Sequence, residues 1–489
     1  MVIFGRTTRC APMLFSSITF IFYFLPLFLA VYYFLGIRNG VLLAGSALFY
    51  TWGEGKYICL LLGLVALNQG TGVLIQRRDG SLRKLILACG ITANLATLGF
   101  FKYSQFIVDV FAAIIDTKTI KLNIHLPLGI SFFTFQLISY LIEIYRRTIP
   151  AERNFVRLAT YVMMFPHLVA GPIVRYTDIS GELRDRAVNP ARAELAIQYF
   201  IIGLSQKVLI ANTMAPVADH VFGLPPQSVT TVDAWLGSFA YTLQIYFDFC
   251  GYSNMAIGLA LLLGFHFPKN FDYPYASRSI TEFWRRWHMS LSFWFRDYLF
   301  IPLGGSRCGK VRTVRNLLFV FLVTGLWHGA AWTFVFWGLF HGIFVALERI
   351  GLGALLNRAP QGVSRVYTLL VVMAAWVFFR AGTFTQAWVI IRAMVGFGAS
   401  DVWDPIALWV TPETICAFIT GSILSFPVVP WALKRYNRPL ISFRSAHPTL
   451  QTSPQESRLL PTTVLLCGFL ASIALLASGS LNPFLYFRF

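Results

Sequence analysis

Apolar runs of about 20 residues recur along this chain of 489 residues, and each run is long enough to cross a bilayer as a helix. Hydrophobic residues make up 56% of the chain and charged residues 12%, which is about half the charged share of a soluble protein. Helices satisfy their own backbone hydrogen bonds in lipid. The sequence therefore predicts an all-α, polytopic integral membrane protein with about 10–13 membrane segments.

We expect one membrane domain over residues 1–489, with N-terminal helices at 14–115, a catalytic core at 124–350 and C-terminal helices at 365–489. The run from Leu14 is too long for a signal-peptide core and has no A-x-A cleavage site, so it is interpreted as a retained span.

The segment 161–173 is too short to cross alone and is broken by prolines and glycine, which favours a re-entrant or interfacial helix. His167 lies in this segment. Its simplest interpretation is a histidine bonded to a helix end.

The formal net charge of +19 does not indicate nucleic-acid binding, because the lysines and arginines fall mainly in short segments between apolar runs. That pattern is typical of cytoplasmic loops. Seven cysteines are scattered without a CxxC pair, so neither a disulfide framework nor a zinc site is expected, and no metal ligands are assigned.

His328 lies in the middle of an apolar stretch, 316–341, that contains no charged residue. Counting about 1.5 Å per helical residue from Arg315 places it roughly 20 Å into the membrane. The run is interrupted at His328-Gly329. An ionisable group at this depth is a functional-site candidate. The alternative is a core histidine bonded to a neighbouring helix, and His341 in the same stretch shows that histidines here need not all be catalytic.

The segment 281–303 has the pattern of an amphipathic, aromatic-rich helix at the membrane interface. On a helical period, Arg285, Ser292 and Arg296 share one face and His288 lies about 60° to its side, whereas Trp287 belongs to a broad aromatic face. The alternative to a functional role is a membrane-surface anchor with solvated arginines.

Asp248 and Asn254 stand among apolar neighbours in a long run. A carboxylate there must find a donor or stay protonated. Both an interhelical hydrogen bond and a role at the site remain open for this pair.

No pattern of a soluble enzyme is present: there is no G-x-S-x-G, Walker loop, H-E-x-x-H or dinucleotide fingerprint. If His328 and His288 meet in a tunnel between helices, burial keeps the imidazoles neutral. A neutral imidazole can take a proton from a hydroxyl that attacks an activated acyl group. The basic segments nearby are suited to a phosphorylated donor such as a coenzyme A thioester. We assign seven further side chains to substrate binding: Arg285, Trp287, Ser292, Arg296, Trp327, Asp248 and Asn254.

Three segments, QIYFDFCGYSNMAIGLALLLGF, FWRRWHMSLSFWFRDYLFIPLGG and TGLWHGAAWTFVFWGLFHG, resemble the membrane-bound O-acyltransferase family. FPHLVAGPI and the terminal NPFLYFRF are similar to its bacterial branch that O-acetylates exopolysaccharides. The resemblance runs in order from about residue 15 to the C-terminus.

This resemblance implies that His328 matches the family's buried essential histidine. It implies that His288 matches a second polar position, which is asparagine or aspartate in several eukaryotic branches and histidine in the bacterial one. It also implies helices around a central tunnel and cytoplasmic acetyl-CoA as donor substrate, with no bound cofactor. The acyl group would pass to a periplasmic SGNH-hydrolase-like partner or to a polysaccharide hydroxyl. The protein would then be multi-pass in the bacterial inner membrane, surrounded by lipid.

Two other functions are weighed. SFWFRDY also resembles the D-alanine transfer protein of teichoic-acid modification. A non-enzymatic transporter that uses the histidines as a proton relay is the third possibility, but transporters often have repeated halves and none is evident here.

Overall fold

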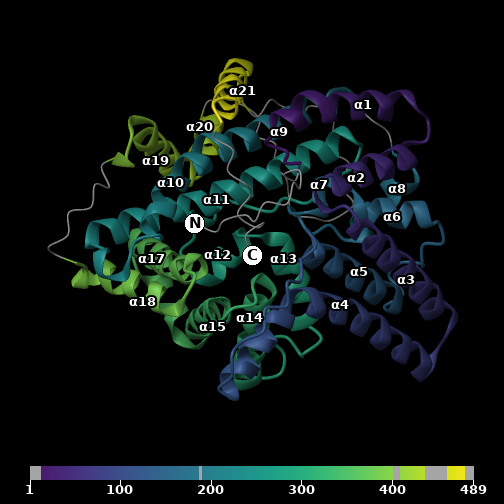
Figure 1. Ribbon diagram of the computed structural model, residues 1–489, viewed down its shortest axis with the longest axis horizontal. Coiled ribbons are helices and arrows are strands. Elements are labelled where there is room, and N and C mark those ends of the chain that lie inside the picture. Colours follow the sequence, from purple (N-terminus) through teal and green to yellow (C-terminus); the bar gives the residue numbers. More distant parts are fainter. Residues whose placement is uncertain (1–12, 187–189, 400–407, 436–459, 480–489) are drawn as a thin grey trace. The chain divides into compact units, whose positions relative to one another are not determined.

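The computed structural model describes residues 13–186, 190–399, 408–435 and 460–479, and every regular element among them is a helix (Figure 1). NPFLYFRF lies outside these residues. The chain divides into two compact units, Met1–Ala187 with Gly264–His266 and Val188–Leu263 with Phe267–Phe489. The internal boundaries expected for a single domain remain predictions.

Six helices of the described residues are long and apolar enough to cross a membrane: Tyr57–Arg77, Gly80–Ile114, Arg192–Val221, Thr231–Leu262, Trp332–Arg358 and Gln361–Arg380. Five shorter apolar helices accompany them: Phe20–Phe34, Ile130–Tyr145, Phe384–Phe397, Pro412–Leu424 and Thr462–Ala477. The all-helical, polytopic class is therefore confirmed. The number of segments, the re-entrant helices and the tunnel remain predictions.

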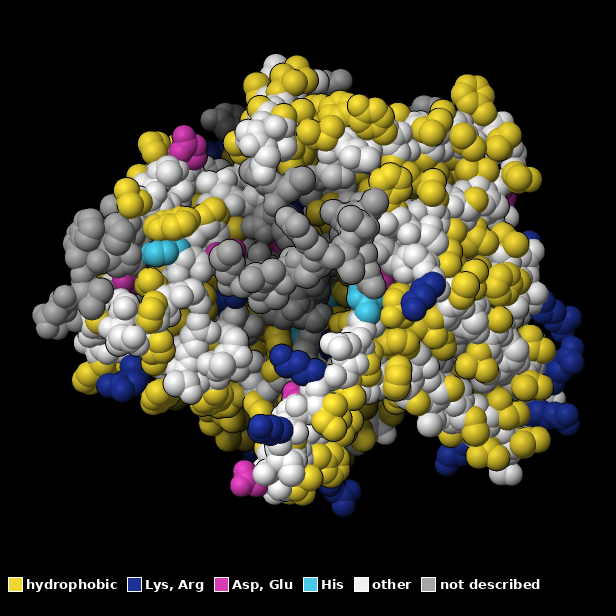
Figure 2. Space-filling model, in the orientation of Figure 1, with side chains coloured by type: hydrophobic (Ala, Val, Ile, Leu, Met, Phe, Trp, Pro, Cys, Tyr) yellow, Lys and Arg dark blue, Asp and Glu magenta, His cyan; other side chains and the backbone are white. Residues whose placement is uncertain are grey.

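Hydrophobic side chains cover wide areas of the face displayed in Figure 2. Long helices place large apolar side chains outward along their length. On α4, which is Gly80–Ile114, these include Leu85, Leu95, Phe100, Ile107 and Phe111. A soluble surface rarely exposes such a continuous apolar area, whereas lipid contact requires one.

The first unit contains η1 and the helices α1 to α8: Phe20–Phe24, Leu25–Phe34, Arg38–Glu54, Tyr57–Arg77, Gly80–Ile114, Ile130–Tyr145, Phe155–Met163, Phe165–Leu168 and Tyr176–Arg184. A pair of buried amides joins α3 to α4, because Asn68 and Asn94 each donate Nδ2–H to the other's Oδ1, at 3.1 and 2.8 Å. These bonds satisfy polar groups that lipid cannot.

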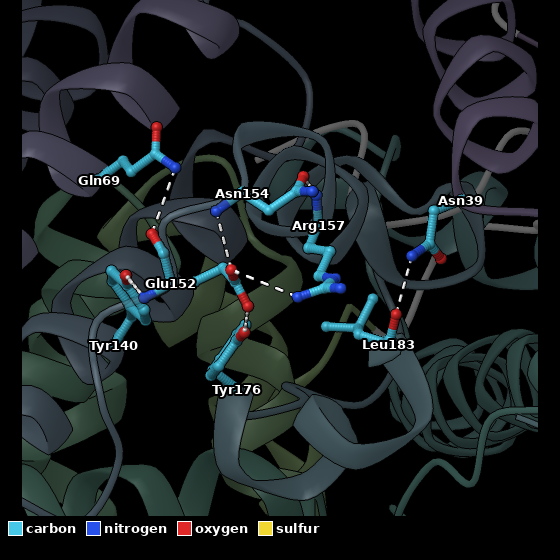
Figure 3. A network of polar contacts seen from close by, with 8 residues as sticks. All are labelled: Asn39, Gln69, Tyr140, Glu152, Asn154, Arg157, Tyr176 and Leu183. Atoms are coloured by element: carbon cyan, nitrogen blue, oxygen red, sulfur yellow. Dashed lines mark hydrogen bonds and ion pairs between the residues drawn. The ribbon is translucent and has the colours of Figure 1, made fainter. Parts of the chain in front are cut away.

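A buried carboxylate organises the polar interior of this unit (Figure 3). Glu152 accepts hydrogen bonds from the Tyr176 hydroxyl at 2.8 Å and from the Asn154 backbone N–H at 2.8 Å. Its own backbone N–H donates to the Tyr140 hydroxyl at 2.9 Å, and its carbonyl accepts from Gln69 at 3.2 Å. Glu152 therefore ties the loop after α5 to α3, α5 and α8.

The segment 161–173 is short and broken, as its prolines and glycine predict: α6 ends at Met163, and the four-residue α7 follows. His167 is buried and its Nε2 lies 2.7 Å from the Tyr161 carbonyl oxygen of α6. The interpretation of His167 as a histidine bonded to a helix end is confirmed.

The second unit contains α-helices, 3₁₀-helices and π-helices. Its α-helices α9 to α15 are Pro190–Ser205, Asn212–Val221, Thr231–Leu262, Ile280–Arg286, Met289–Phe295, Lys310–His328 and Trp332–Leu347. Those from α16 to α21 are Gly353–Arg358, Gln361–Arg380, Phe384–Arg392, Pro412–Leu424, Val428–Arg435 and Thr462–Ala477. The short helices η2 to η7 are Gln206–Ala211, Pro226–Ser228, Pro274–Ala276, Arg296–Phe300, Glu348–Leu352 and Ala393–Phe397. Helix α11 packs on α9 through glycine: a Cβ on Gly203 would lie 2.4 Å from the Gly251 carbonyl oxygen.

Candidate active site

Helix α14 ends at His328, and α15 begins at Trp332. The predicted interruption at His328-Gly329 is confirmed. The two helices cross without side chains between them, because a Cβ on Gly325 would lie 2.3 Å from the Phe334 carbonyl oxygen. His328 is therefore the last residue of a helix that is held by direct backbone contact to the next one.

His328 is buried, with 5% of its surface exposed, and aromatic rings surround it. Its ring centroid lies 4.8 Å from Trp327, 4.9 Å from Trp337 and 5.4 Å from Phe379, each in an edge-to-face arrangement. The burial predicted for this position is confirmed. Burial among apolar rings is unfavourable for a charged side chain.

The prediction of one continuous interfacial helix over 281–303 is wrong. The chain forms α12, α13 and η5 in succession, and between α12 and α13 His288 adopts left-handed backbone angles, φ +42° and ψ +55°. The reason is tertiary: the Asn270 carbonyl oxygen accepts the Met289 N–H at 2.9 Å, and the Asp272 N–H donates to the Arg286 carbonyl at 2.9 Å. These bonds replace helical ones, so the predicted alignment of side chains does not hold across the break.

His288 is completely buried and lies near the same indole as His328. Its ring centroid is 6.4 Å from Trp327 and 4.6 Å from Phe249. Both histidine rings therefore lie next to the Trp327 indole. Burial lowers the pKa of His288 to about 3, so this ring is neutral near pH 7.

Asn270 forms a hydrogen bond with His288 and is a residue that was not predicted from the sequence. The Asn270 Oδ1 lies 3.1 Å from the His288 Nδ1 and also accepts from the Ser290 hydroxyl at 2.9 Å. Its Nδ2–H donates to the Ser253 hydroxyl at 3.1 Å. An asparagine in a loop carries no chemical signal in the sequence, because turns use asparagine routinely.

The residues predicted to bind substrate fall into three groups. Trp287 and Trp327 are buried among rings, Trp287 with its centroid 4.9 Å from Trp376. Ser292 is half-buried, whereas Arg285 and Arg296 are exposed. The Arg296 guanidinium pairs with Asp297 at 2.7 Å.

Asp248 and Asn254 form the third group, and both contact the helix η2. The Asp248 carboxylate pairs with the Lys207 ammonium, and both side chains are buried. Asn254 donates Nδ2–H to the Gln206 Oε1 at 2.8 Å. These contacts favour the interhelical alternative for the pair. The same helix α11 still serves the site through Phe249 and Ser253.

His341 is fully buried in α15 and lies against the same ring cluster. Its centroid is 5.2 Å from both Trp284 and Trp337, and Phe283 stacks on it at 6.1 Å. Neither of its ring nitrogens has a hydrogen-bond partner among the described residues. No group of three or more histidine, cysteine or acidic side chains in the described part of the chain is arranged to hold a metal ion.

Comparison with known proteins gives one family match. The model of the membrane-bound O-acyltransferase family matches residues 146–386, which include Asn270, His288, His328 and His341.

Three relatives extend this match. A probable alginate O-acetylase of Pseudomonas putida is 41% identical over 98% of this chain and 100% of its own length. A peptidoglycan O-acetyltransferase of Helicobacter pylori is 36% identical over 79% of this chain and 81% of its own length. A teichoic acid D-alanyltransferase of Streptococcus thermophilus is 33% identical over 45% of this chain and 56% of its own length.

Proposed function

Because this chain belongs to the membrane-bound O-acyltransferase family, we propose that it supplies acetyl groups for the O-acetylation of an extracytoplasmic polysaccharide of the alginate type. It is an O-acyltransferase. Identity to probable alginate O-acetylases along the whole chain supports the acetyl group and the polysaccharide acceptor. The multi-pass architecture supports a location in the bacterial inner membrane.

The observation that carries the mechanism is the burial of two histidines against one indole. In this mechanism His328 is the central residue and His288 lies beside it. The neutral imidazole of His328 accepts the proton of the attacking hydroxyl. The hydroxyl oxygen bonds to the thioester carbonyl carbon, the carbon–sulfur bond breaks, and the thiolate leaves and takes up a proton. The ring cluster around His328 excludes water, which would otherwise hydrolyse the thioester.

The donor in this proposal is acetyl-CoA from the cytoplasm. The exposed Arg285 and Arg296 are candidates to bind its phosphates. The acetyl group passes to a polysaccharide hydroxyl, either directly or through a periplasmic SGNH-hydrolase-like partner. Trp287, Ser292 and Trp327 line the proposed substrate path.

The test uses the purified protein in vesicles that contain labelled acetyl-CoA. A His328→Ala variant should lose transfer by a factor of at least about 100, the usual scale for a general base, while its size-exclusion profile stays that of the wild type. A well-folded variant that transfers acetyl at the wild-type rate would refute the role of His328.

D-alanyl transfer is the second candidate, because the teichoic acid D-alanyltransferase matches 45% of the chain. The two reactions add groups of different mass, so mass spectrometry of the modified polymer separates them. An added acetyl group supports the first function, and an added alanyl group supports the second.

A further inference from the structure

We infer that Asn270 is a positioning residue that holds His288 in one tautomer, with Nδ1 protonated and Nε2 facing the reaction as a hydrogen-bond acceptor. This inference rests on the proposed acyl transfer, which needs a neutral imidazole with an accepting nitrogen.

The orientation of the Asn270 amide is the first step. Its Nδ2 lies 3.1 Å from the Ser253 Oγ, and its Oδ1 lies within 3.3 Å of the Ser290 backbone N and 2.9 Å of the Ser290 Oγ. A backbone N–H is always a donor, so the atom that faces it is the amide oxygen. Asn270 therefore presents its oxygen to Ser290 and His288 and its NH₂ group to Ser253.

The tautomer of His288 follows from that orientation. The Nδ1 of His288 lies 3.1 Å from the same amide oxygen, and two acceptors cannot form a hydrogen bond with each other. Nδ1 must carry the proton. In a neutral imidazole the other nitrogen, Nε2, then has a lone pair and no proton, and it has no hydrogen-bond partner among the described residues.

The backbone around His288 shows how firmly this arrangement is held. His288 has φ +42°, a left-handed conformation that is strained for a residue other than glycine and persists where the surroundings enforce it. Asn270 contributes to that enforcement, because its carbonyl accepts the Met289 N–H. One residue thus fixes both the backbone next to His288 and the proton on its ring.

The chemical consequence concerns which substrate group His288 serves. An unprotonated Nε2 accepts a proton or a hydrogen bond but cannot donate one to a carbonyl oxygen. His288 therefore serves the attacking hydroxyl and not the acyl carbonyl. The hydrogen-bond and ring partners of His288, which include Phe249 and Trp327, are uncharged, so they do not favour its protonation.

The first experiment measures the tautomer directly in the wild-type protein, which has eight histidines. Nitrogen-15 NMR of histidine-labelled protein in lipid nanodiscs distinguishes a protonated from an unprotonated nitrogen, and the His288→Gln spectrum identifies the signal of residue 288. We expect protonated Nδ1 and unprotonated Nε2. A proton on Nε2, or a mixture of both tautomers, would overturn the inference and leave acyl transfer itself untouched.

The second experiment uses the Asn270→Leu and Asn270→Asp variants. Leucine removes the acceptor, so the tautomers of His288 should mix and kcat should fall by at least about 100-fold, while KM for acetyl-CoA stays within about threefold. Aspartate restores an acceptor and should recover much of kcat. Its negative charge raises the pKa of His288, so the activity of this variant alone should decline as the pH falls through that raised pKa.

Asn94→Leu is the matched control, because it removes another buried, helix-linking amide that is remote in sequence from the site. It should retain kcat. An Asn270→Leu protein with normal kcat would contradict the inference. So would equal losses of kcat in Asn270→Leu and Asn94→Leu, since that result indicates general destabilisation. If the wild-type protein does not transfer acetyl groups either, that result would count against the proposed function instead.

Discussion

Buried polar side chains in the second unit differ in their hydrogen-bond and ion-pair partners. Asp248 pairs with Lys207, and His288 bonds to Asn270, so each has a polar partner. His341 is enclosed by rings, and neither of its nitrogens has a hydrogen-bond partner among the described residues. We therefore expect His341 to stabilise the fold through the packing of its ring and not through hydrogen bonds.

Replacing His341 with phenylalanine tests that distinction. His341→Phe keeps a planar ring against Trp284 and Trp337 and removes two buried polar atoms, so the free energy of unfolding should stay the same or rise slightly. Acetyl transfer should remain within about threefold of wild type, since no proton transfer is assigned here. The measurements are thermal unfolding in detergent and transfer from labelled acetyl-CoA. A loss as large as that of His328→Ala would show that His341 takes part in the chemistry.

At the scale of elements, the position of His328 depends on how closely α14 and α15 approach. Gly325 and Gly338 face each other at the crossing, and a Cβ on Gly338 would lie 2.3 Å from the Phe321 carbonyl oxygen. Backbone atoms cannot move aside as a flexible side chain can. Any added methyl group must therefore separate the helices.

Gly325→Ala should lower both thermal stability and acetyl transfer, because separating the helices shifts His328, three residues away, from its ring contacts. The expected loss of stability is about 1–3 kcal/mol, the usual cost of overpacking. Gly63→Ala is the control: its Cβ meets no atom within 4 Å in α3, so alanine should be neutral or stabilising. If both variants behave alike, the contact at Gly325 does not constrain the hairpin.

Hydropathy and helix breakers in the sequence predicted much of the architecture. The long apolar runs and the break at His328-Gly329 are local features, and both are present in the structure. The break at His288 is not local, because it depends on hydrogen bonds that the Asn270 carbonyl accepts and the Asp272 N–H donates. A helical period applied across the break therefore places side chains wrongly. For the same reason the sequence identified His288 but missed the residue that orients it.

At the scale of the whole molecule, both units bury a histidine outside the candidate spans. Burial lowers the pKa of His167 in the first unit to about 4 and that of His288 in the second to about 3, from an ordinary value of 6.5. At a pH between each lowered pKa and 6.5, these histidines bind protons in the unfolded chain but not in the folded chain. Acid therefore favours unfolding, and the stability is fully present only above about pH 6.5.

The unfolding temperature in detergent should therefore fall as the pH is lowered from about 7.5 to about 5. The free energy of unfolding should drop by up to about 1.4 kcal/mol per pH unit for each of these two histidines. The His288→Gln protein should show a shallower fall, because one of the contributing groups is gone. An unfolding temperature that is constant or rises on acidification would contradict this account.

The left-handed backbone at residue 288 also restricts which mutations evolution can accept there. Apart from glycine, the amino acids that adopt this conformation most readily are asparagine, aspartate and histidine. These are the same three that the family resemblance associates with this position. A glycine would fit the backbone but has no side chain for chemistry, and a bulky apolar residue would be strained as well as inert. The backbone at residue 288 therefore restricts the side chains that this position can hold, independently of any catalytic role.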